Sequence, residues 1–428
     1  MSAHKISPWF CLVETLLHCY FERQFAQDHA RIDSAVLRID PTNAKLFSPM
    51  TPDQHLVEFA QSIGFQLAAI IPSRPSTHLQ HLEDWLDQGC HGEMTYMSRN
   101  LDLRAHTALL HPGTQTVLAL AALYKQEQSD PFLPAYARDA DYHDVLRARL
   151  KQLVRFAETL VGLPKAAIKA RGFVDSAPVL ERDLARLAGL GWIGKNTCLI
   201  HPQLGSYLFL AEVCLPFDLA AETPPALQPE RCGTCTRCLA VCPTNALAKP
   251  RWLDARACIS YLTIELRGAI PLHLRRALGS HLFGCDDCQS VCPWNRKAPT
   301  TIEPAFIAKE AFQPIDFLGL DEPTFRAKYR KTPLFRAHRE GMARNACVVI
   351  ANTRQREHLP ALADTLRRDP SPMVRGHAAW ALGELGESEL LRDAHAAETD
   401  ASVLEEISRA LAEPTDRQPQ EQEEGERS

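Results

Sequence analysis

The sequence has no long apolar run and no large excess of charge of either sign. No window approaches the roughly 18 uncharged apolar residues that a membrane-spanning helix needs, so we expect no membrane partner. The N-terminus lacks the basic stretch, long apolar stretch and cleavage site of a signal peptide. The formal net charge of the 428 residues is −5, which excludes a strongly basic nucleic-acid-binding chain. These absences predict a cytoplasmic protein.

A phosphate-binding loop is also missing. The one candidate, Gly189–Asn196, departs from G-x-x-x-x-G-K-[ST] because Asn196 follows Lys195 and the glycine spacing differs. Its three glycines instead predict a close backbone approach to a large flat ligand, with Lys195 supplying a charge beside it. A common glycine-rich turn is the alternative.

Cysteine is plentiful, and eight of the fourteen cysteines follow the spacing of iron–sulfur proteins. One run reads C-x2-C-x2-C-x3-C-P and a second reads C-x2-C-x3-C-P, with Cys258 as the candidate for its missing first ligand. In two-cluster ferredoxins the fourth cysteine of each run binds the other cluster. The spacing therefore predicts two [4Fe–4S] clusters, one held by Cys232, Cys235, Cys238 and Cys292 and the other by Cys242, Cys258, Cys285 and Cys288.

Zinc ribbons and structural disulfides are the alternatives for these cysteines. Zinc does not explain the x3-C-P endings or the crossover of two runs, and iron–sulfur clusters favour a reducing compartment. The remaining cysteines are predicted to be core thiols: Cys11, Cys19, Cys90, Cys198, Cys214 and Cys347.

The length predicts several domains. We expect an N-terminal extension preceding a true start at Met50, a mixed helix–strand domain, a cysteine module, a helical domain and a disordered acidic tail. Their predicted bounds are 1–49, 50–220, 221–300, 301–412 and 413–428.

Local patterns supply candidate elements and sites. Val117–Ala121 is typical of a buried strand, and residues 143–161 have helical spacing. Pro370–Gly383 is similar to a HEAT-type repeat helix, with Ala343–Ile350 as a preceding unit; a plain helical cap is the alternative. Val174–Pro178 places a carboxylate, Asp175, at a strand end, as a site residue or as a structural cap.

A basic stretch with interleaved aromatic residues predicts phosphate contacts, a solvated helix face being the alternative. It contains Arg326, Lys328, Arg330, Lys331, Arg336, Arg339 and Arg344, with Phe325, Tyr329 and Phe335 between them.

Taken together, these motifs resemble the epoxyqueuosine reductases, cobalamin-dependent iron–sulfur enzymes of tRNA modification. The resemblance covers roughly residues 50–412. Besides the eight cysteines, it is carried by His91–Met97, Asp141–His143, Val174–Pro178, Gly189–Asn196, Gly205 and Ser206, Cys258–Glu265, Gly284–Gln289 and Cys292–Asn295.

The resemblance implies an α+β multidomain fold. A corrinoid-binding α/β domain like that of reductive dehalogenases would be followed by a ferredoxin-like two-cluster module and C-terminal HEAT-like helices. It implies reduction of epoxyqueuosine to queuosine at the wobble position of tRNA, the last step of queuosine biosynthesis. Cobalamin would be reduced through the two clusters by an external low-potential donor, and the protein is expected to be a monomer.

The resemblance also implies residue roles. Asp175 matches the family's proton donor, and we expect its pKa to be raised beside an apolar cofactor face. Cofactor contacts are expected from Tyr96, Asp175, Lys195, Ser260 and Asp286, with Asp287 as a further candidate. His143 is expected to make a local hydrogen bond at a helix start. Arg336 and Arg339 are expected to bind tRNA phosphates.

Two other functions fit parts of the pattern. A corrinoid iron–sulfur reductase acting on a small molecule, similar to a reductive dehalogenase, would share both cofactors. A pure electron carrier would need neither the long domain before the clusters nor the Asp175 motif.

Overall fold

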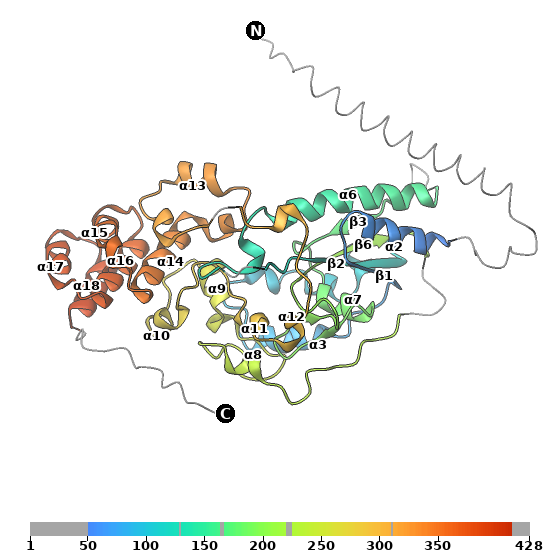
Figure 1. The fold of residues 1–428 in the computed structure, drawn as a ribbon, viewed down its shortest axis with the longest axis horizontal. Helices are drawn as coiled ribbons and strands as arrows, with labels where there is room; N and C mark the ends of the chain where they lie inside the picture. The colour runs from blue at the N-terminus through green and yellow to red at the C-terminus, as the bar shows by residue number, and fades with distance from the viewer. Residues whose placement is uncertain (1–49, 128–129, 163–166, 220–224, 310, 413–428) are drawn as a thin grey trace, which may run out of the picture. The chain divides into compact units, whose positions relative to one another are not determined.

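The computed structural model describes residues 50–412 apart from 128–129, 163–166, 220–224 and 310 (Figure 1). The predicted N-terminal extension and acidic tail lie outside the described residues. From Pro52 onward the described residues belong to one compact unit. Among the helices in that part of the chain, none has the length and apolar character to cross a membrane.

A four-stranded antiparallel sheet forms the centre of the first part. It contains β1 (Leu67–Pro72), β2 (Thr116–Leu123), β6 (Leu208–Leu215) and β3 (Arg171–Phe173), in the order β1-β2-β6-β3. All eight residues of β2 are buried, which confirms the strand predicted at Val117–Ala121. A separate hairpin pairs β4 (Trp192–Ile193) with β5 (Leu199–Ile200).

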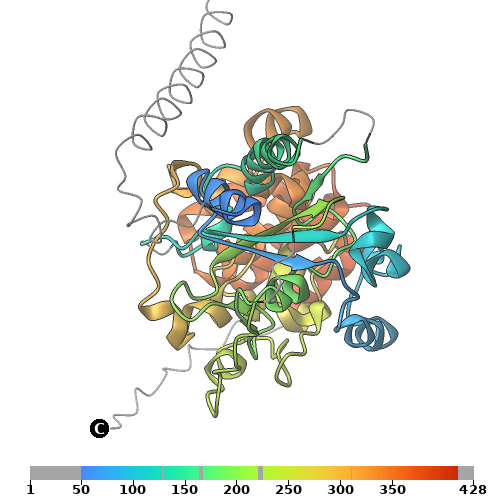
Figure 2. The ribbon, with the colours of Figure 1, turned by 90° about the vertical axis from the view of Figure 1, so that its right-hand side faces the viewer.

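Helices cover both faces of this sheet because both faces are apolar. Leu118 and Leu120 of β2 pack with α2 (Pro52–Ser62) and α6 (Tyr142–Leu160), whereas Val117 packs with α7 (Glu181–Leu187) on the other face. Figure 2 shows α2 and α6 together on one side of the strands. Helix α6 confirms the helix predicted at 143–161.

Short helices complete this part and make up most of the cysteine module. They are α3 (Leu79–Asp87), η1 (Thr95–Met97), α4 (Leu101–Arg104), α5 (Thr107–Leu110) and η2 (Ala135–Ala137), then α8 (Arg237–Ala240), η3 (Ala255–Ala257), α9 (Ile259–Ile264), α10 (Leu272–Arg275), η4 (Arg276–Leu278), α11 (Asp287–Ser290) and α12 (Pro293–Arg296). The module is thus built mainly from loops and single helical turns.

The remaining described chain is helical. It contains η5 (Pro304–Phe306), η6 (Pro314–Phe317), α13 (Glu322–Tyr329), η7 (Pro333–Ala337), α14 (His338–Asn352), η8 (Arg356–His358), α15 (Leu359–Arg368), α16 (Pro372–Glu384), α17 (Ser388–Ala397) and α18 (Ala401–Ala412). Helix α16 packs against α14, α15 and α18, and small residues allow the approach. A Cβ on Gly383 would lie 2.7 Å from Cβ of Ala410. This stacking of helix pairs agrees with the HEAT-type repeats predicted here.

Part of the basic stretch is buried, which corrects the prediction made for it. Arg339 forms a bidentate ion pair with Asp369, with N–O distances of 2.8 and 3.0 Å. Both side chains are at most 5% exposed. Arg344 is fully buried and donates to the carbonyls of Leu262, Leu266 and Gly268. Arg339 and Arg344 therefore hold the fold together and are unavailable to phosphates.

Two of the three aromatic residues of the stretch are also not free for stacking with bases, and the third, Phe335, is partly buried. Phe325 and Tyr329 are fully buried in the core beneath α13 and α14. The cations that remain exposed are Arg326, Lys328, Arg330, Lys331 and Arg336.

Replacing Arg339 with alanine should therefore destabilise the protein, because Asp369 would be left as a buried, unpaired charge. The expected loss is about 3–5 kcal/mol, measured as a lower urea midpoint for the transition of the helical part. Arg368→Ala is the matched control, since its side chain is 79% exposed. Equal midpoints for the two variants would contradict a structural role for the Arg339–Asp369 pair.

Candidate functional site

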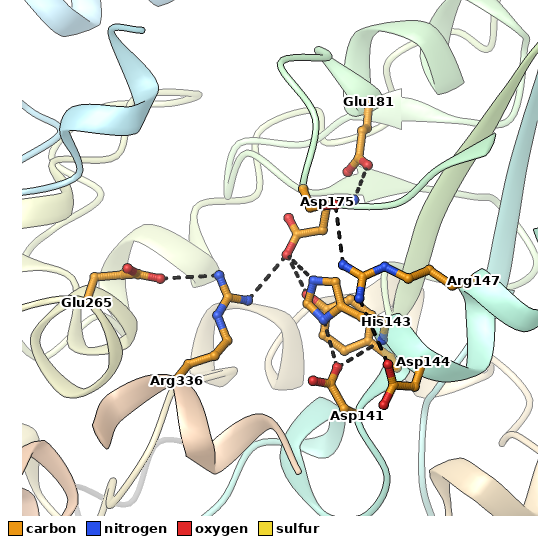
Figure 3. A network of polar contacts seen from close by, with 10 residues as sticks. Asp141, His143, Asp144, Arg147, Asp175, Glu181, Glu265 and Arg336 are labelled. Atoms are coloured by element: carbon orange, nitrogen blue, oxygen red, sulfur yellow. Dashed lines mark hydrogen bonds and ion pairs between the residues drawn. The ribbon is translucent and has the colours of Figure 1, made fainter. Parts of the chain in front are cut away.

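The carboxylate of Asp175 is the centre of a polar network (Figure 3). Its Oδ2 accepts a hydrogen bond from the Tyr142 hydroxyl at 2.6 Å and lies 3.2 Å from Nε2 of His143. The same oxygen is 3.3 Å from the Arg336 guanidinium, which also contacts Glu265 at 3.3 Å. The Asp175 side chain nevertheless remains 42% exposed, so a reactant can reach it.

Different segments bring these groups together. Asp175 follows β3 in a left-handed backbone conformation, with φ at 53°. Tyr142 and His143 begin α6, whose N-cap Asp141 accepts a hydrogen bond from the His143 backbone N–H. Arg336 comes from η7, far along the chain. The predicted local bond of His143 is confirmed, since its Nδ1 lies 2.7 Å from Asp141. The second contact, to Asp175, had not been expected.

The charges in this network correct the expectation for Asp175. Burial raises the pKa of the Asp175 carboxyl. The hydrogen bonds from His143 and Tyr142 and the positive charge of Arg336 lower this pKa by more than burial raises it, so the net shift is downward. Burial lowers the pKa of His143, whereas the carboxylates of Asp141 and Asp175 raise it, to about 9. At neutral pH the proton therefore resides on His143, and Asp175 is ionised.

Two further carboxyl groups, those of Glu181 and Glu212, interact with Asp175, and the sequence analysis missed both. Oε1 of Glu181 accepts the backbone N–H of Asp175 at 2.6 Å. Burial, and next the charge of Asp175, raise the pKa of Glu181 to about 8. Glu212 is 1% exposed on β6, where burial and next Glu181 raise its pKa well above the usual value. The signal that could have found it is one acidic residue inside the otherwise apolar strand Leu208–Leu215.

Tyr96, predicted as a cofactor contact, lies near the Asp175 network. Its side chain is 46% exposed. Burial raises the pKa of its hydroxyl to about 12, as do the charges of Glu265 and Asp175, while Arg336 acts in the opposite direction. The exposed ring is therefore close to the same charged groups that surround the carboxylate.

Ser260 and Asp286 lie at the junction between the cysteine module and the sheet domain. Oγ of Ser260 accepts the backbone N–H of Cys285 at 3.0 Å, and Oδ2 of Asp286 accepts that of Ala135 at 3.0 Å. Asp287 instead pairs with His281 at 3.0 Å. Ser260 and Asp286 thus fix the backbone that joins one cysteine run to the site.

Lys195 is placed beside the other cysteine run. Its Nζ donates to the carbonyls of Gly233 at 2.7 Å and Cys235 at 2.9 Å. The glycines before it serve the protein's own backbone, because a Cβ on Gly191 would lie 2.4 Å from the Ile200 carbonyl oxygen. The expected approach of a flat ligand to these glycines stays a prediction.

The neighbours of the described cysteines agree with the two predicted quartets, whose ligand sets stay a prediction. Cys238 has Cys232, Cys292 and Cys235 as its charged neighbours. Cys258 neighbours Cys242, and Cys285 and Cys288 both neighbour Cys258. All described cysteines are free thiols. Two groups of four thiols fit a pair of [4Fe–4S] clusters, and the described cysteines form no disulfide with one another.

The other described cysteines differ in their surroundings. Cys90, Cys214 and Cys347 are buried, as predicted for core thiols. Cys198 is only partly buried and its thiol contacts that of Cys288. Cys11 and Cys19 lie outside the described residues.

Known proteins resemble the chain over most of its length. Family models match three segments: "Epoxyqueuosine reductase QueG, DUF1730" at residues 104–176, "4Fe-4S double cluster binding domain" at 231–295 and "HEAT repeats" at 334–412. An epoxyqueuosine reductase of Xanthomonas campestris is 40% identical over 82% of this chain and 99% of its own length. The chain belongs to the epoxyqueuosine reductase family. A second family member, from Pseudomonas aeruginosa, is 40% identical over 78% of this chain and 95% of its own.

Solved structures of epoxyqueuosine reductases have the same fold. One, in complex with an epoxyqueuosine-modified tRNA stem loop, has a TM-score of 0.74 and 29% identity, over 83% of this chain and 97% of that one. Another, from Bacillus subtilis, has its catalytic loop swung out of the active site; its TM-score is 0.72, with 28% identity over 83% of this chain and 97% of that one. The predicted α+β fold with C-terminal helical repeats is therefore confirmed.

The raised pKa of His143 makes stability depend on pH. A raised pKa means that the protonated imidazole stabilises the fold fully below its usual pKa of 6.5, and that this contribution is lost as pH rises through about 9. Between pH 6.5 and about pH 9, we expect the free energy of unfolding of the wild type to fall by up to about 3 kcal/mol relative to that of His143→Gln. Urea midpoints at both ends of this range would measure the difference.

The exposed histidine of α2 provides the control. His55→Gln should retain the pH dependence of the wild type. If His143→Gln also retained it, His143 would not be the group that holds the proton.

Proposed function

We propose that this protein reduces epoxyqueuosine to queuosine at the wobble position of tRNA. The observation that carries the proposal is an exposed carboxylate, Asp175, that accepts a hydrogen bond from Tyr142 and lies 3.2 Å from Nε2 of His143, in a chain of the epoxyqueuosine reductase family that also has a two-cluster module. Converting the epoxide to the alkene takes two electrons and two protons, and the oxygen leaves as water. The site therefore needs both a proton supply and an electron supply.

The proton supply follows from the charges. Asp175 is ionised at rest, so it transfers a proton that it receives rather than one that it stores. His143 is the store, because its pKa of about 9 keeps it protonated at neutral pH and its Nε2 lies 3.2 Å from Asp175. As the epoxide C–O bond breaks, His143 passes its proton to Asp175, and Asp175 passes it to the developing alkoxide. The imidazole then takes up a second proton from solvent, and the same route delivers it as the oxygen leaves as water.

Cobalamin is the organic cofactor in this proposal. When bound, it supplies a cobalt centre that is reduced to a strong nucleophile. Tyr96 and Asp175 fit such a ligand because both are substantially exposed and lie near Arg336. Ser260 and Asp286 hold the backbone at Cys285 and Ala135, and Lys195 supports the cysteine loop at Gly233 and Cys235.

The two cysteine quartets would carry the electrons in sequence. We place the quartet of Cys242, Cys258, Cys285 and Cys288 nearer the Asp175 network, because the buried Tyr136 interacts electrostatically with both Cys258 and Arg336. We therefore propose that the quartet of Cys232, Cys235, Cys238 and Cys292 receives electrons from the external donor and passes them inward.

The tRNA would be bound by the exposed part of the basic stretch. Arg326, Arg330 and Lys331 are exposed on and after α13, and Arg336 connects that region to Asp175. The wobble nucleotide must leave the stacked loop for its cyclopentene ring to reach the site. We also propose that the protein is a monomer and that its domains are residues 50–220, 221–300 and 301–412.

Replacing Asp175 with asparagine should abolish most turnover, because the proton could no longer pass from His143 to the alkoxide. We expect kcat to fall by a factor of about 10² to 10⁴, while iron content stays as in the wild type. The assay weighs nucleosides from epoxyqueuosine-tRNA after anaerobic reaction with a low-potential reductant. Asp144→Asn is the control, since this side chain is 72% exposed; near-normal turnover by Asp175→Asn would remove Asp175 from this role.

Replacing Cys258 with alanine should remove one cluster only. Iron should fall from about eight to about four atoms per chain, and turnover should be lost although cobalamin still binds. Cys198→Ala is a strict control, because this thiol contacts Cys288 but belongs to neither quartet. Full iron content in Cys258→Ala, or loss of iron in Cys198→Ala, would contradict the proposed ligand sets.

A further inference from the structure

Four cations lie close in sequence to the ligands of the quartet of Cys232, Cys235, Cys238 and Cys292, which we call the outer quartet. Arg231 immediately precedes Cys232, Arg237 immediately precedes Cys238, and Arg296 and Lys297 follow Cys292 at the end of α12. All four side chains are exposed. We call this set, Arg231, Arg237, Arg296 and Lys297, the basic collar.

The collar's charge is not neutralised by the protein itself. Within the described residues, no ion pair or side-chain hydrogen bond involves any of the four. The carboxylate nearest in sequence, Glu230, is paired with Arg251, and Asp254 is paired with Arg256. No acidic residue occurs between Arg231 and Lys249 or between Cys288 and Thr301. The surface over this quartet is therefore positively charged, although the whole chain carries a net charge of −5.

The second quartet, which we call the inner quartet, has acidic rather than basic residues beside its ligands. Its ligands are Cys242, Cys258, Cys285 and Cys288. Asp286 and Asp287 lie between Cys285 and Cys288, and Glu265 is the C-cap residue of α9, the helix that begins directly after Cys258. The two quartets thus differ in the sign of the charged residues that lie beside their ligands in the sequence.

The collar lies apart from the basic residues assigned to tRNA. Arg326 and Arg330 belong to or follow α13, whereas Arg237 begins α8. Figures 1 and 2 show α13 and α8 on opposite sides of the ribbon. A second basic surface, placed over an electron-accepting centre, suits a second and different partner.

We propose that the basic collar is the docking surface for an acidic one-electron carrier protein. The inference rests on the proposed function, which needs an external source of two electrons. Opposite charges steer such a partner to the collar and hold its redox group over the outer quartet. The small, exposed residues Gly233, Thr234 and Thr236 between the cations leave room for close approach. Each carrier gives up one electron and the outer cluster gains it, so two docking events supply one turnover.

Reduction of the clusters by flavodoxin hydroquinone provides the test, because flavodoxin is acidic and becomes the semiquinone as it gives up one electron. The full chain with reconstituted clusters is mixed with the carrier in a stopped-flow instrument, without tRNA, and the loss of cluster absorbance is followed. For the double variant Arg231→Glu/Arg237→Glu we expect the second-order rate constant at low salt to fall roughly tenfold or more. The steep decrease with salt seen for the wild type should also disappear.

Matched controls separate docking from damage to the cluster. Arg367→Glu/Arg368→Glu changes the charge by the same amount on the exposed side of α15 and should stay within about twofold of wild type. Reduction by dithionite, iron content and cluster reduction potentials should be unchanged in both double variants. Arg231→Lys/Arg237→Lys should retain most of the wild-type rate, since the charge is kept.

Three results would overturn the proposal. The first is an unchanged flavodoxin rate in the charge-reversed variant. The second is an equal loss with dithionite, which would mean that the cations tune the cluster. The third is weaker tRNA binding with an unchanged flavodoxin rate, which would make the collar an RNA surface. Because the assay contains no tRNA, a wrong assignment of the substrate would leave its result intact.

Discussion

One carboxylate oxygen, Oδ2 of Asp175, accepts contacts from three side chains that come from two parts of the chain. Tyr142 and His143 reach it from the start of α6, and Arg336 reaches it from η7. A carboxylate that is partly removed from water stays ionised only while such donors remain in place. The sheet must therefore present the end of β3 beside the start of α6, and the helical repeats must hold η7 against both.

The cysteine module connects the sheet to the helical repeats, although it has little regular structure. On the sheet side, the amide of Asn295 accepts from and donates to Ser206, and Lys125 donates to the carbonyls of Asn295 and Ala298. On the helical side, Arg344 and Asn345 of α14 donate to carbonyls around α9. Side chains thus replace the backbone ladders that the loops lack. The same bonds hold the cysteine module against the sheet on one side and against α14 on the other.

The sequence predicted elements and ligands whose signal is local. The apolar run of β2, the periodicity of α6 and the cysteine spacing each lie within a short segment, so pattern alone was enough. The charge state of Asp175 could not be predicted, because Arg336 lies 161 positions away and its approach depends on the whole fold. For the same reason, a charge count could not distinguish exposed Arg326 from Arg339, whose partner Asp369 is 30 positions distant.

The backbone at Asp175 narrows the amino acids that this position accepts. Its left-handed φ of 53° is costly for most residues with a Cβ, but aspartate, asparagine and glycine adopt it comparatively readily. Glutamate would keep the acid but fit the turn poorly, whereas asparagine and glycine would keep the turn and lose the acid. Aspartate alone satisfies both demands. In a newly found sequence of this kind, a glutamate aligned here would therefore signal a change in the turn as well as in the chemistry.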